Sequence, residues 1–239
     1  MSINYTPNFS TIRRNPKKIK YIIFHYTGMR SENKAINRLL NVKSKVSCHY
    51  FIKKNGQVIF MIPAFLEAWH AGKSKWKKDK SLNKYSIGIE IANKGHEFGY
   101  EKFSKMQILS LIKLSKYLIN KYKINKKNIL GHSDIAFERK KDPGEKFPWK
   151  FLASKGVGIW HNINKTQLKK LRKLRLTNSE KLKGIKFLEK IGYSLNKEKD
   201  KNYSKLIKSF QRRFRQELID GRMDKECLII AKKLSKTDN

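Results

Sequence analysis

Apolar runs of strand length recur along the first 130 residues of the chain. They occupy the ranges 19–24, 46–53, 57–62, 86–91 and 128–130. Most of them are rich in the β-branched and aromatic residues that strands favour. Asn55-Gly56 lies between the second and the third run and predicts the two-residue turn of a β-hairpin. The pattern therefore predicts a sheet that includes one hairpin.

Segments with helical spacing lie between these runs. The range 30–40 predicts a short helix. The range 103–122 predicts a long helix that covers one face of the sheet, because its apolar residues recur every three or four positions: Ile108, Leu111, Ile112, Leu118, Ile119 and Tyr122. We therefore predict an α/β fold with a mixed central sheet flanked by helices.

The pattern changes after Trp160. The range 164–176 is strongly basic with few aromatic residues, and it predicts a connecting helix or linker. Three amphipathic segments follow, at 179–193, 203–216 and 224–234, and they predict a small C-terminal three-helix bundle. We divide the chain into a first domain at 1–163, a basic linker at 164–177 and a helical domain at 178–239.

The segment 131–149, GHSDIAFERKKDPGEKFPW, follows a predicted strand and carries candidate metal ligands. His132 offers an imidazole nitrogen, and Asp142 offers a carboxylate held by the turn that Pro143 begins. Catalytic zinc sites usually have three protein ligands and an open fourth position. His25 is the best candidate for the third ligand, because it follows a buried strand-like run.

Glu90 ends another strand-like run, SIGIEI, so we expect it at the same sheet edge as His25 and His132. Each histidine taken singly is more simply explained as a hydrogen-bonded structural residue. Their combination with Asp142 and the carboxylate of Glu90 favours a zinc site.

Two further histidines lie outside this set. His49 falls inside the predicted hairpin, where a packed, hydrogen-bonded side chain is the simpler interpretation. His70 follows Trp69 in a predicted loop, where substrate contact competes with a structural role. The range 73–84 is basic and contains Trp76, and we expect it to form a solvated rim of the cleft or an insertion.

These motifs resemble a known family, the zinc-dependent N-acetylmuramoyl-L-alanine amidases of the type-2 amidase superfamily, and within it the AmiD-like branch. The resemblance rests on FHYT, VSCHYFI, AWHAG, SIGIEIANKG, the 131–149 segment and GVGIW, and it covers most of residues 17–160. The 131–149 motif is highly specific, whereas FHYT alone would be weak. The implied fold is that of the type-2 amidases.

The resemblance implies a role for each matching residue. His25, His132 and Asp142 would hold one Zn²⁺ per chain, and Glu90 and Lys140 would be catalytic. Glu90 would move a proton from water to the departing nitrogen, and Lys140 would stabilise the oxyanion. The implied substrate is the amide between N-acetylmuramic acid and L-alanine in peptidoglycan or its muropeptide fragments. A non-catalytic peptidoglycan-recognition protein is the alternative.

The resemblance also implies substrate contacts, for which His70, Trp69 and His49 are the candidates. The C-terminal segment resembles the peptidoglycan-binding domain that follows this amidase type, through FQRRF and IDGRMD. As a separate wall-binding module, it would be dispensable for hydrolysis of small soluble muropeptides. The alternative is a helical bundle that only stabilises the amidase.

Composition adds one unusual feature. Among 239 residues, 39% are hydrophobic and 11% aromatic, which is sufficient for a packed core. The formal net charge is +37, and such a surplus attracts polyanions of any kind. A basic nucleic-acid-binding protein is therefore a third hypothesis, although no nucleic-acid motif accompanies the charge. A biased genome composition explains the lysines equally well.

The remaining expectations concern location and assembly. Cys48 and Cys227 are far apart in the sequence, so we expect reduced, buried thiols. The first 20 residues show no signal peptide or lipobox-like cysteine, and no run is long enough to span a bilayer. The sequence alone thus favours a cytoplasmic location, whereas the resemblance implies the cell envelope or periplasm. We expect a monomer without a specific nucleic-acid partner.

Overall fold

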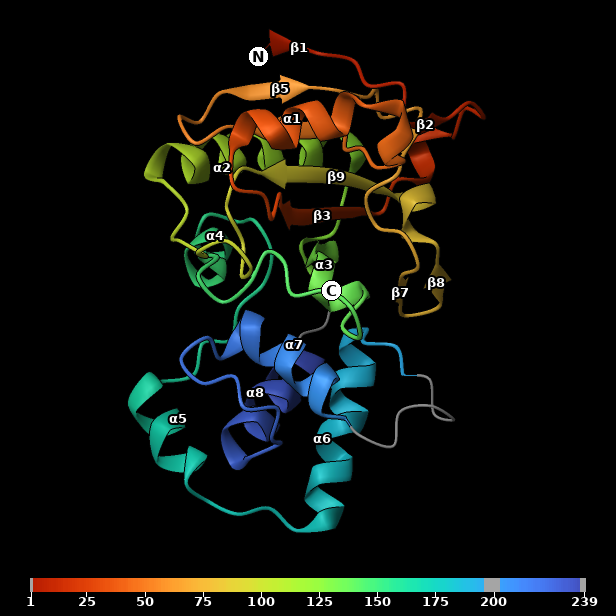
Figure 1. Cartoon of the computed structure of the whole chain (residues 1–239). Helices are drawn as coiled ribbons and strands as arrows, with labels where there is room; N and C mark the ends of the chain where they lie inside the picture. Colours follow the sequence, from red (N-terminus) through yellow and green to blue (C-terminus); the bar gives the residue numbers. More distant parts are fainter. Residues whose placement is uncertain (1, 196–202, 237–239) are drawn as a thin grey trace.

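The computed structural model describes residues 2–195 and 203–236, and within them a six-stranded mixed sheet lies in the upper half of the view, above the C-terminal helices (Figure 1). The neighbouring parallel strands are β4, β9, β3 and β10, while β5 runs antiparallel to β4 and pairs in parallel with β1. The strands, in sheet order, are β1 (Ser2–Ile3), β5 (Val58–Phe60), β4 (Tyr50–Ile52), β9 (Ser86–Ile91), β3 (Tyr21–Tyr26) and β10 (Ile129–Gly131). The predicted mixed sheet and its β4–β5 hairpin are confirmed.

One face of this sheet is covered by the long helix α2 (Lys105–Tyr122). Successive strand residues point to opposite faces, so Ile22 and Phe24 of β3 share this face with Ile89 of β9. They pack against the apolar stripe of α2 and against the short helix α4 (Trp149–Ser154). A capping box formed by Ser104 and Gln107 fixes where α2 begins. The prediction for residues 103–122 is confirmed.

The other face of the sheet is covered at its two ends by different elements. Helix α1 (Glu32–Leu40) packs over Phe51 and Ile59 through Ala35 and Leu39. The opposite end, with Ile23 and Leu130, belongs to a separate apolar cluster that includes the C-terminal helices. The strip of sheet between these two clusters carries His25 and Glu90.

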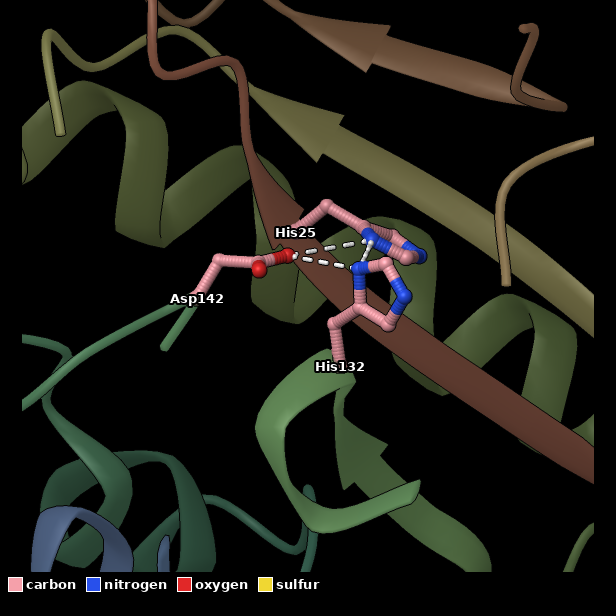
Figure 2. A group of neighbouring side chains, drawn as sticks. All are labelled: His25, His132 and Asp142. Carbon is pink, nitrogen blue, oxygen red and sulfur yellow. Dashed lines mark hydrogen bonds and ion pairs between the residues drawn. The ribbon is translucent and has the colours of Figure 1, made fainter. Parts of the chain in front are cut away.

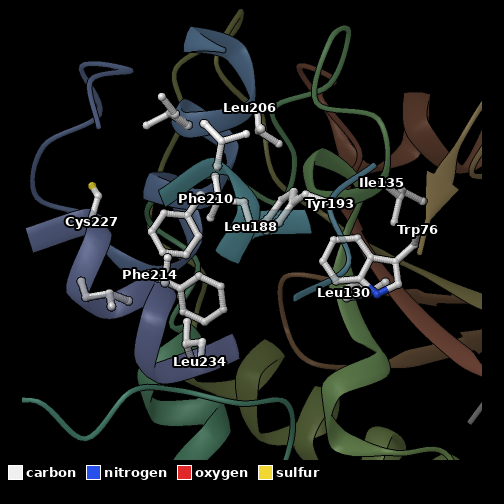
Figure 3. Packing of buried hydrophobic residues seen from close by; sticks show 14 of the residues in the cluster. Trp76, Leu130, Ile135, Leu188, Tyr193, Leu206, Phe210, Phe214, Cys227 and Leu234 are labelled. Atoms are coloured by element: carbon white, nitrogen blue, oxygen red, sulfur yellow. The ribbon is translucent and has the colours of Figure 1, made fainter. Parts of the chain in front are cut away.

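The C-terminal helices are α5 (Lys165–Arg172), α6 (Asn178–Ile191), α7 (Ser204–Phe214) and α8 (Lys225–Ser235). Figure 3 shows Leu188, Phe210 and Phe214 of these helices in one cluster with Leu130 and with Ile135 of the short helix α3 (His132–Ile135). A self-contained three-helix bundle is therefore not confirmed. Helix α5 packs on α8, and the amphipathic helices complete their core against the end of the sheet that carries Ile23 and Leu130.

The expectation of a solvated rim at residues 73–84 holds for most of its lysines, which are exposed, and is wrong for Trp76. This segment forms a small hairpin of β7 (Lys75–Trp76) and β8 (Asp79–Lys80). Trp76 is only 1% exposed, and its ring lies 4.9 Å from that of Tyr193, centroid to centroid. Gly192 permits this contact, because a β-carbon there would come within 2.3 Å of the indole. The surrounding lysines made this segment read as solvated. Burial of the large apolar area of Trp76 nevertheless decides where the segment packs.

Some smaller features complete the fold. A second, two-stranded sheet pairs β2 (Phe9–Ser10) with β6 (Glu67–Ala68). Cys48 and Cys227 are free, buried thiols, as predicted. Among the described residues, every helix is too short or too polar to cross a lipid bilayer.

Candidate metal centre and active site

The candidate site forms where three parallel strands end. His25 of β3 and Glu90 of β9 are register partners and project from the same face of the sheet. His132 is the first residue of α3 and directly follows β10. Asp142 reaches the site from the loop after α3. Because carboxyl ends of neighbouring parallel strands meet at one edge, residues more than 100 positions apart converge here.

His25, His132 and Asp142 form a tight triangle of buried donor atoms (Figure 2). The two Nδ1 atoms of the histidines lie 3.0 Å apart. Asp142 Oδ2 lies 3.2 Å from Nδ1 of His25 and 3.0 Å from Nδ1 of His132. Close approach of the Asp142 loop requires Gly131, since a β-carbon there would lie 2.7 Å from the Pro143 ring. The three donors could hold one metal ion.

Hydrogen bonds to the outer nitrogens orient both imidazoles. His132 donates from Nε2 to the Ala71 carbonyl at 3.2 Å, which leaves its Nδ1 lone pair free. His25 Nε2 lies 3.0 Å from His70 Nδ1, and His70 Nε2 lies 3.1 Å from the Ser86 hydroxyl, which itself donates to the Leu82 carbonyl. One consistent proton assignment runs outward along this chain from His25 Nε2–H. Both Nδ1 atoms then face the centre as acceptors.

The electrostatics favour the protonation states that metal ligands need. Burial, reinforced by the neighbouring His132, lowers the pKa of His25 to about 4, so the imidazole is neutral near pH 7. Burial alone would raise the pKa of Asp142, but its contacts with the two histidines outweigh that effect and hold this pKa below its usual range. The site therefore offers the neutral imidazole of His25 and the carboxylate of Asp142 as metal ligands.

Glu90 faces the same cavity without a hydrogen-bond partner for one oxygen. Its Oε2 is buried, and the described residues provide no donor for it. Burial, together with the charge of Asp142, raises the pKa of Glu90 to about 8, and Lys140 offsets part of this effect. A carboxyl group with a pKa near neutrality can both accept and return a proton, as a general base and acid must.

The donor triangle opens into a cavity of about 440 Å³. Lys140 lines this cavity and is half-buried. Its neighbour Arg139 also lines it and donates to the carbonyls of Ala71 and Lys73. Arg38 and Lys141 add further positive charge, so the cavity is basic around its acidic centre.

Of the three predicted substrate contacts, Trp69 and His70 line the cavity and His49 does not. Trp69 lines the cavity and donates from its indole to Ser10. His70 also lines the cavity, but both of its ring nitrogens are engaged in the chain that orients His25. His49 is fully buried outside the cavity, where its Nδ1 accepts from the Gly88 amide, so the packed interpretation fits this residue better than substrate contact.

Sequence reasoning missed a polar network around His96, which lines the cavity. Nδ1 of His96 lies 2.8 Å from the Tyr26 hydroxyl oxygen, and its Nε2 lies 3.1 Å from Glu145 Oε2. Its ring stacks on Tyr100, whose hydroxyl donates to the Pro143 carbonyl beside Asp142. The only signal in the sequence was a histidine shortly after the strand that carries Glu90.

Comparison with known proteins agrees with this arrangement. Residues 15–145 match the family model described as N-acetylmuramoyl-L-alanine amidase. N-acetylmuramoyl-L-alanine amidase AmiD of Escherichia coli is 31% identical over 230 residues, which cover 91% of this chain and 82% of AmiD. The 1,6-anhydro-N-acetylmuramyl-L-alanine amidase AmpD of Haemophilus influenzae is 30% identical over 168 residues, which cover 62% of this chain and 89% of AmpD.

Solved structures extend the similarity to nearly the whole chain. Escherichia coli AmiD, in complex with anhydro-N-acetylmuramic acid-L-Ala-D-gamma-Glu-L-Lys, has a TM-score of 0.78 at 31% identity and covers 94% of this chain and 91% of its own. AmpDh3 from Pseudomonas aeruginosa, in complex with anhydromuramic pentapeptide, has a TM-score of 0.80 at 28% identity and covers 99% and 98%. The predicted type-2 amidase fold and the predicted enzyme class are confirmed. The chain belongs to the N-acetylmuramoyl-L-alanine amidase family of enzymes.

Proposed function

We propose that this chain is a zinc-dependent amidase that hydrolyses the bond between N-acetylmuramic acid and L-alanine in peptidoglycan fragments. The observation that carries the proposal is the triangle of His25, His132 and Asp142 in the same cavity as Glu90, whose Oε2 has no hydrogen-bond partner among the described residues. Ligand atoms about 2.0 Å from a tetrahedral zinc ion lie about 3.3 Å from one another. The observed separations of 3.0 to 3.2 Å fit that geometry, and the His₂Asp donor set suits zinc.

The chemistry divides among the residues of the cavity. When bound, zinc lowers the pKa of water and polarises a carbonyl group. Glu90 takes the proton of the attacking water on its carboxylate and delivers it to the leaving nitrogen, because an amide anion is too poor a leaving group to depart unprotonated. Lys140 supplies a fixed positive charge where negative charge develops on the carbonyl oxygen.

The basic cavity supports a muropeptide as the substrate. The AmiD and AmpDh3 complexes hold anhydromuramic peptides, and the ligand of AmiD contains a γ-linked glutamate, which keeps a free carboxylate. Arg38, Arg139 and Lys141 line the cavity of this chain and can pair with such carboxylates. Trp69 adds an aromatic surface for the sugar or peptide.

The proposal is tested by peptide release from purified peptidoglycan, with and without a chelator. We expect about one zinc per chain, loss of activity on chelation and recovery with added zinc. His132→Ala should abolish zinc binding. His161→Ala is the matched control, because His161 is a buried histidine that bonds to the Phe214 carbonyl, outside the site. Full activity in a metal-free preparation contradicts the proposal.

We also propose that residues 178–239 bind the cell wall, through a groove of about 610 Å³ that α6, α7, the α7–α8 connection and residues 172–176 before α6 line. Leu174 and Leu218 of this groove are 53% and 38% exposed, and Arg175 and Arg222 lie beside them. The double variant Leu174→Ser, Leu218→Ser should reduce sedimentation with insoluble peptidoglycan at high salt, where the effect of net charge is screened. Unchanged pelleting at high salt contradicts wall binding at this groove.

A further inference from the structure

We propose that Arg213 and Tyr193, both in the C-terminal region, are positioning residues for the metal centre. They hold α3, the four-residue helix that begins with His132, in the orientation that ligation by His132 requires. The inference rests on the proposed zinc site. It assigns the C-terminal helices a part in building the active site, in addition to any contact with the wall.

The contact is made through Asp134, two residues after His132. Asp134 is 1% exposed, and its Oδ2 accepts from Arg213 Nη1 at 2.6 Å and from the Gly131 amide at 2.8 Å. Its Oδ1 accepts from the Tyr193 hydroxyl at 2.7 Å. Both carboxylate oxygens are therefore satisfied, and two of the three donors come from the C-terminal region.

Arg213 and its helix also bind the backbone on each side of His132. Arg213 donates from Nη2 to the Ile129 carbonyl at 2.8 Å, and its guanidinium lies 4.5 Å from the Trp149 ring centroid. One turn earlier in α7, Ser209 donates to the Ser133 carbonyl at 2.8 Å. Helix α7 therefore holds both β10, which ends just before His132, and α3, which begins with His132.

A four-residue helix has little stability of its own, because one turn cannot offset the cost of helix nucleation. The direction of the His132 side chain therefore depends on what holds α3. The apolar contact of Ile135 with the C-terminal cluster is not directional, whereas the two buried hydrogen bonds to Asp134 fix the rotation of the helix. Metal affinity falls when ligands leave their productive geometry by a fraction of an ångström.

The competing explanation is that this ion pair only attaches the C-terminal helices to the rest of the protein. Arg215 supplies the matched control, two residues further along the chain. It is 3% exposed, and it pairs with Asp220 and Asp224 and donates to the Leu218 carbonyl, all within the C-terminal region. Loss of Arg215 disturbs the C-terminal helices without removing a contact to α3.

The test compares Arg213→Met, Tyr193→Phe and Arg215→Met in the full-length chain. The zinc dissociation constant is measured by competition with a chelating dye, and the Tm of each metal-free protein is measured alongside. We expect Arg213→Met and Tyr193→Phe to weaken zinc binding by about 10-fold or more. Arg215→Met should lower the Tm but leave the zinc dissociation constant unchanged.

Tyr193→Phe removes a single hydroxyl, so it keeps the test valid if Arg213→Met does not fold. Equal zinc affinity in wild type and Tyr193→Phe overturns the proposal, as does an equal loss of affinity in Arg215→Met. Failure of the proposed function gives a different result, because wild-type protein itself would then bind no zinc.

Discussion

The imidazole of His70 lies directly against Gly88, so closely that a β-carbon at position 88 would fall 2.4 Å from the ring. Gly88 precedes Glu90 by two residues on β9 and therefore shares its face of the sheet. Because Gly88 has no side chain, the His70 ring can lie against β9 with its Nδ1 3.0 Å from Nε2 of His25. His70 is thus positioned by its contact with Gly88 of β9 and by the hydrogen bond between its Nε2 and the Ser86 hydroxyl.

This arrangement predicts that His70 acts on the metal rather than on the substrate. His70→Ala should weaken zinc binding by about 10- to 100-fold, because His25 loses the partner that fixes its tautomer and ring orientation. Gly88→Ala should act in the same direction. Zinc affinity is measured by chelator competition, with Trp69→Ala as the control that raises KM and keeps the metal. A change in KM alone for His70→Ala contradicts the prediction.

Glu90→Gln should retain zinc and lose on the order of 10²-fold or more in kcat, since the amide cannot take up and return a proton. Single-turnover kinetics and metal analysis measure the two effects separately. Glu97→Gln is the control, because Glu97 is an exposed carboxylate of the same cavity. Loss of zinc in Glu90→Gln makes Glu90 a ligand instead of a base.

The raised pKa of Glu90 also predicts a pH dependence of stability in the metal-free protein. This pKa is about 8 in the folded chain, compared with an ordinary value of 4.5. The folded state therefore favours the protonated carboxyl group. The contribution of Glu90 to the free energy of unfolding is fully present below pH 4.5 and is lost as the pH rises to about 8. Thermal unfolding of metal-free wild type and Glu90→Gln should show a stability difference that grows in favour of the variant across this range. A constant difference from pH 4 to pH 9 contradicts the shift.

Lys140→Ala should lower kcat more than it raises KM, because a charge placed at the developing oxyanion acts mainly in the transition state. Lys141→Ala provides the neighbouring control and should raise KM without lowering kcat, since Lys141 is exposed at the cavity rim, where it can pair with a substrate carboxylate. Steady-state kinetics on a soluble muropeptide separates the two parameters. An effect on KM alone places Lys140 among the substrate-binding residues.

Deletion of residues 178–239 should destabilise the amidase. The C-terminal helices cover Tyr21, Ile23, Leu130 and Ile135, and exposing each such side chain costs about 1.5–3 kcal/mol. The sum is comparable with the whole stability of a domain, about 5–15 kcal/mol. Thermal unfolding and hydrolysis of a small muropeptide measure the outcome. An active truncated chain with an unchanged Tm instead supports the independent module that the sequence pattern predicts.

Local patterns in the sequence were sufficient for most of the secondary structure. The SIGIEI run is β9 as predicted, and residues 103–122 form α2, because alternation and helical spacing depend on which face a segment buries. The hairpin of β4 and β5 follows from Asn55-Gly56, whose backbone preferences act over two residues. Each of these features depends on residues that are close together in the sequence.

The sequence also identified His25, His132 and Asp142, because their motifs combine residue types that metal chemistry needs with strand ends that converge. It could not assign His70, since that role depends on a ring that lies against Gly88 of β9. It misplaced Trp76, whose burial depends on Gly192, more than 100 residues away.

The amino-acid sequence by itself thus determined most of the elements, the candidate ligands and the family of this protein, because each is recorded in short local motifs. Only the tertiary structure decided how the C-terminal helices meet the amidase. Arg213 is one of 56 basic residues in the chain, and its motif FQRRF indicated wall binding rather than a contact with the metal centre. Its partner Asp134 lies 79 positions earlier, and a buried ion pair depends on the position of both side chains in the folded core.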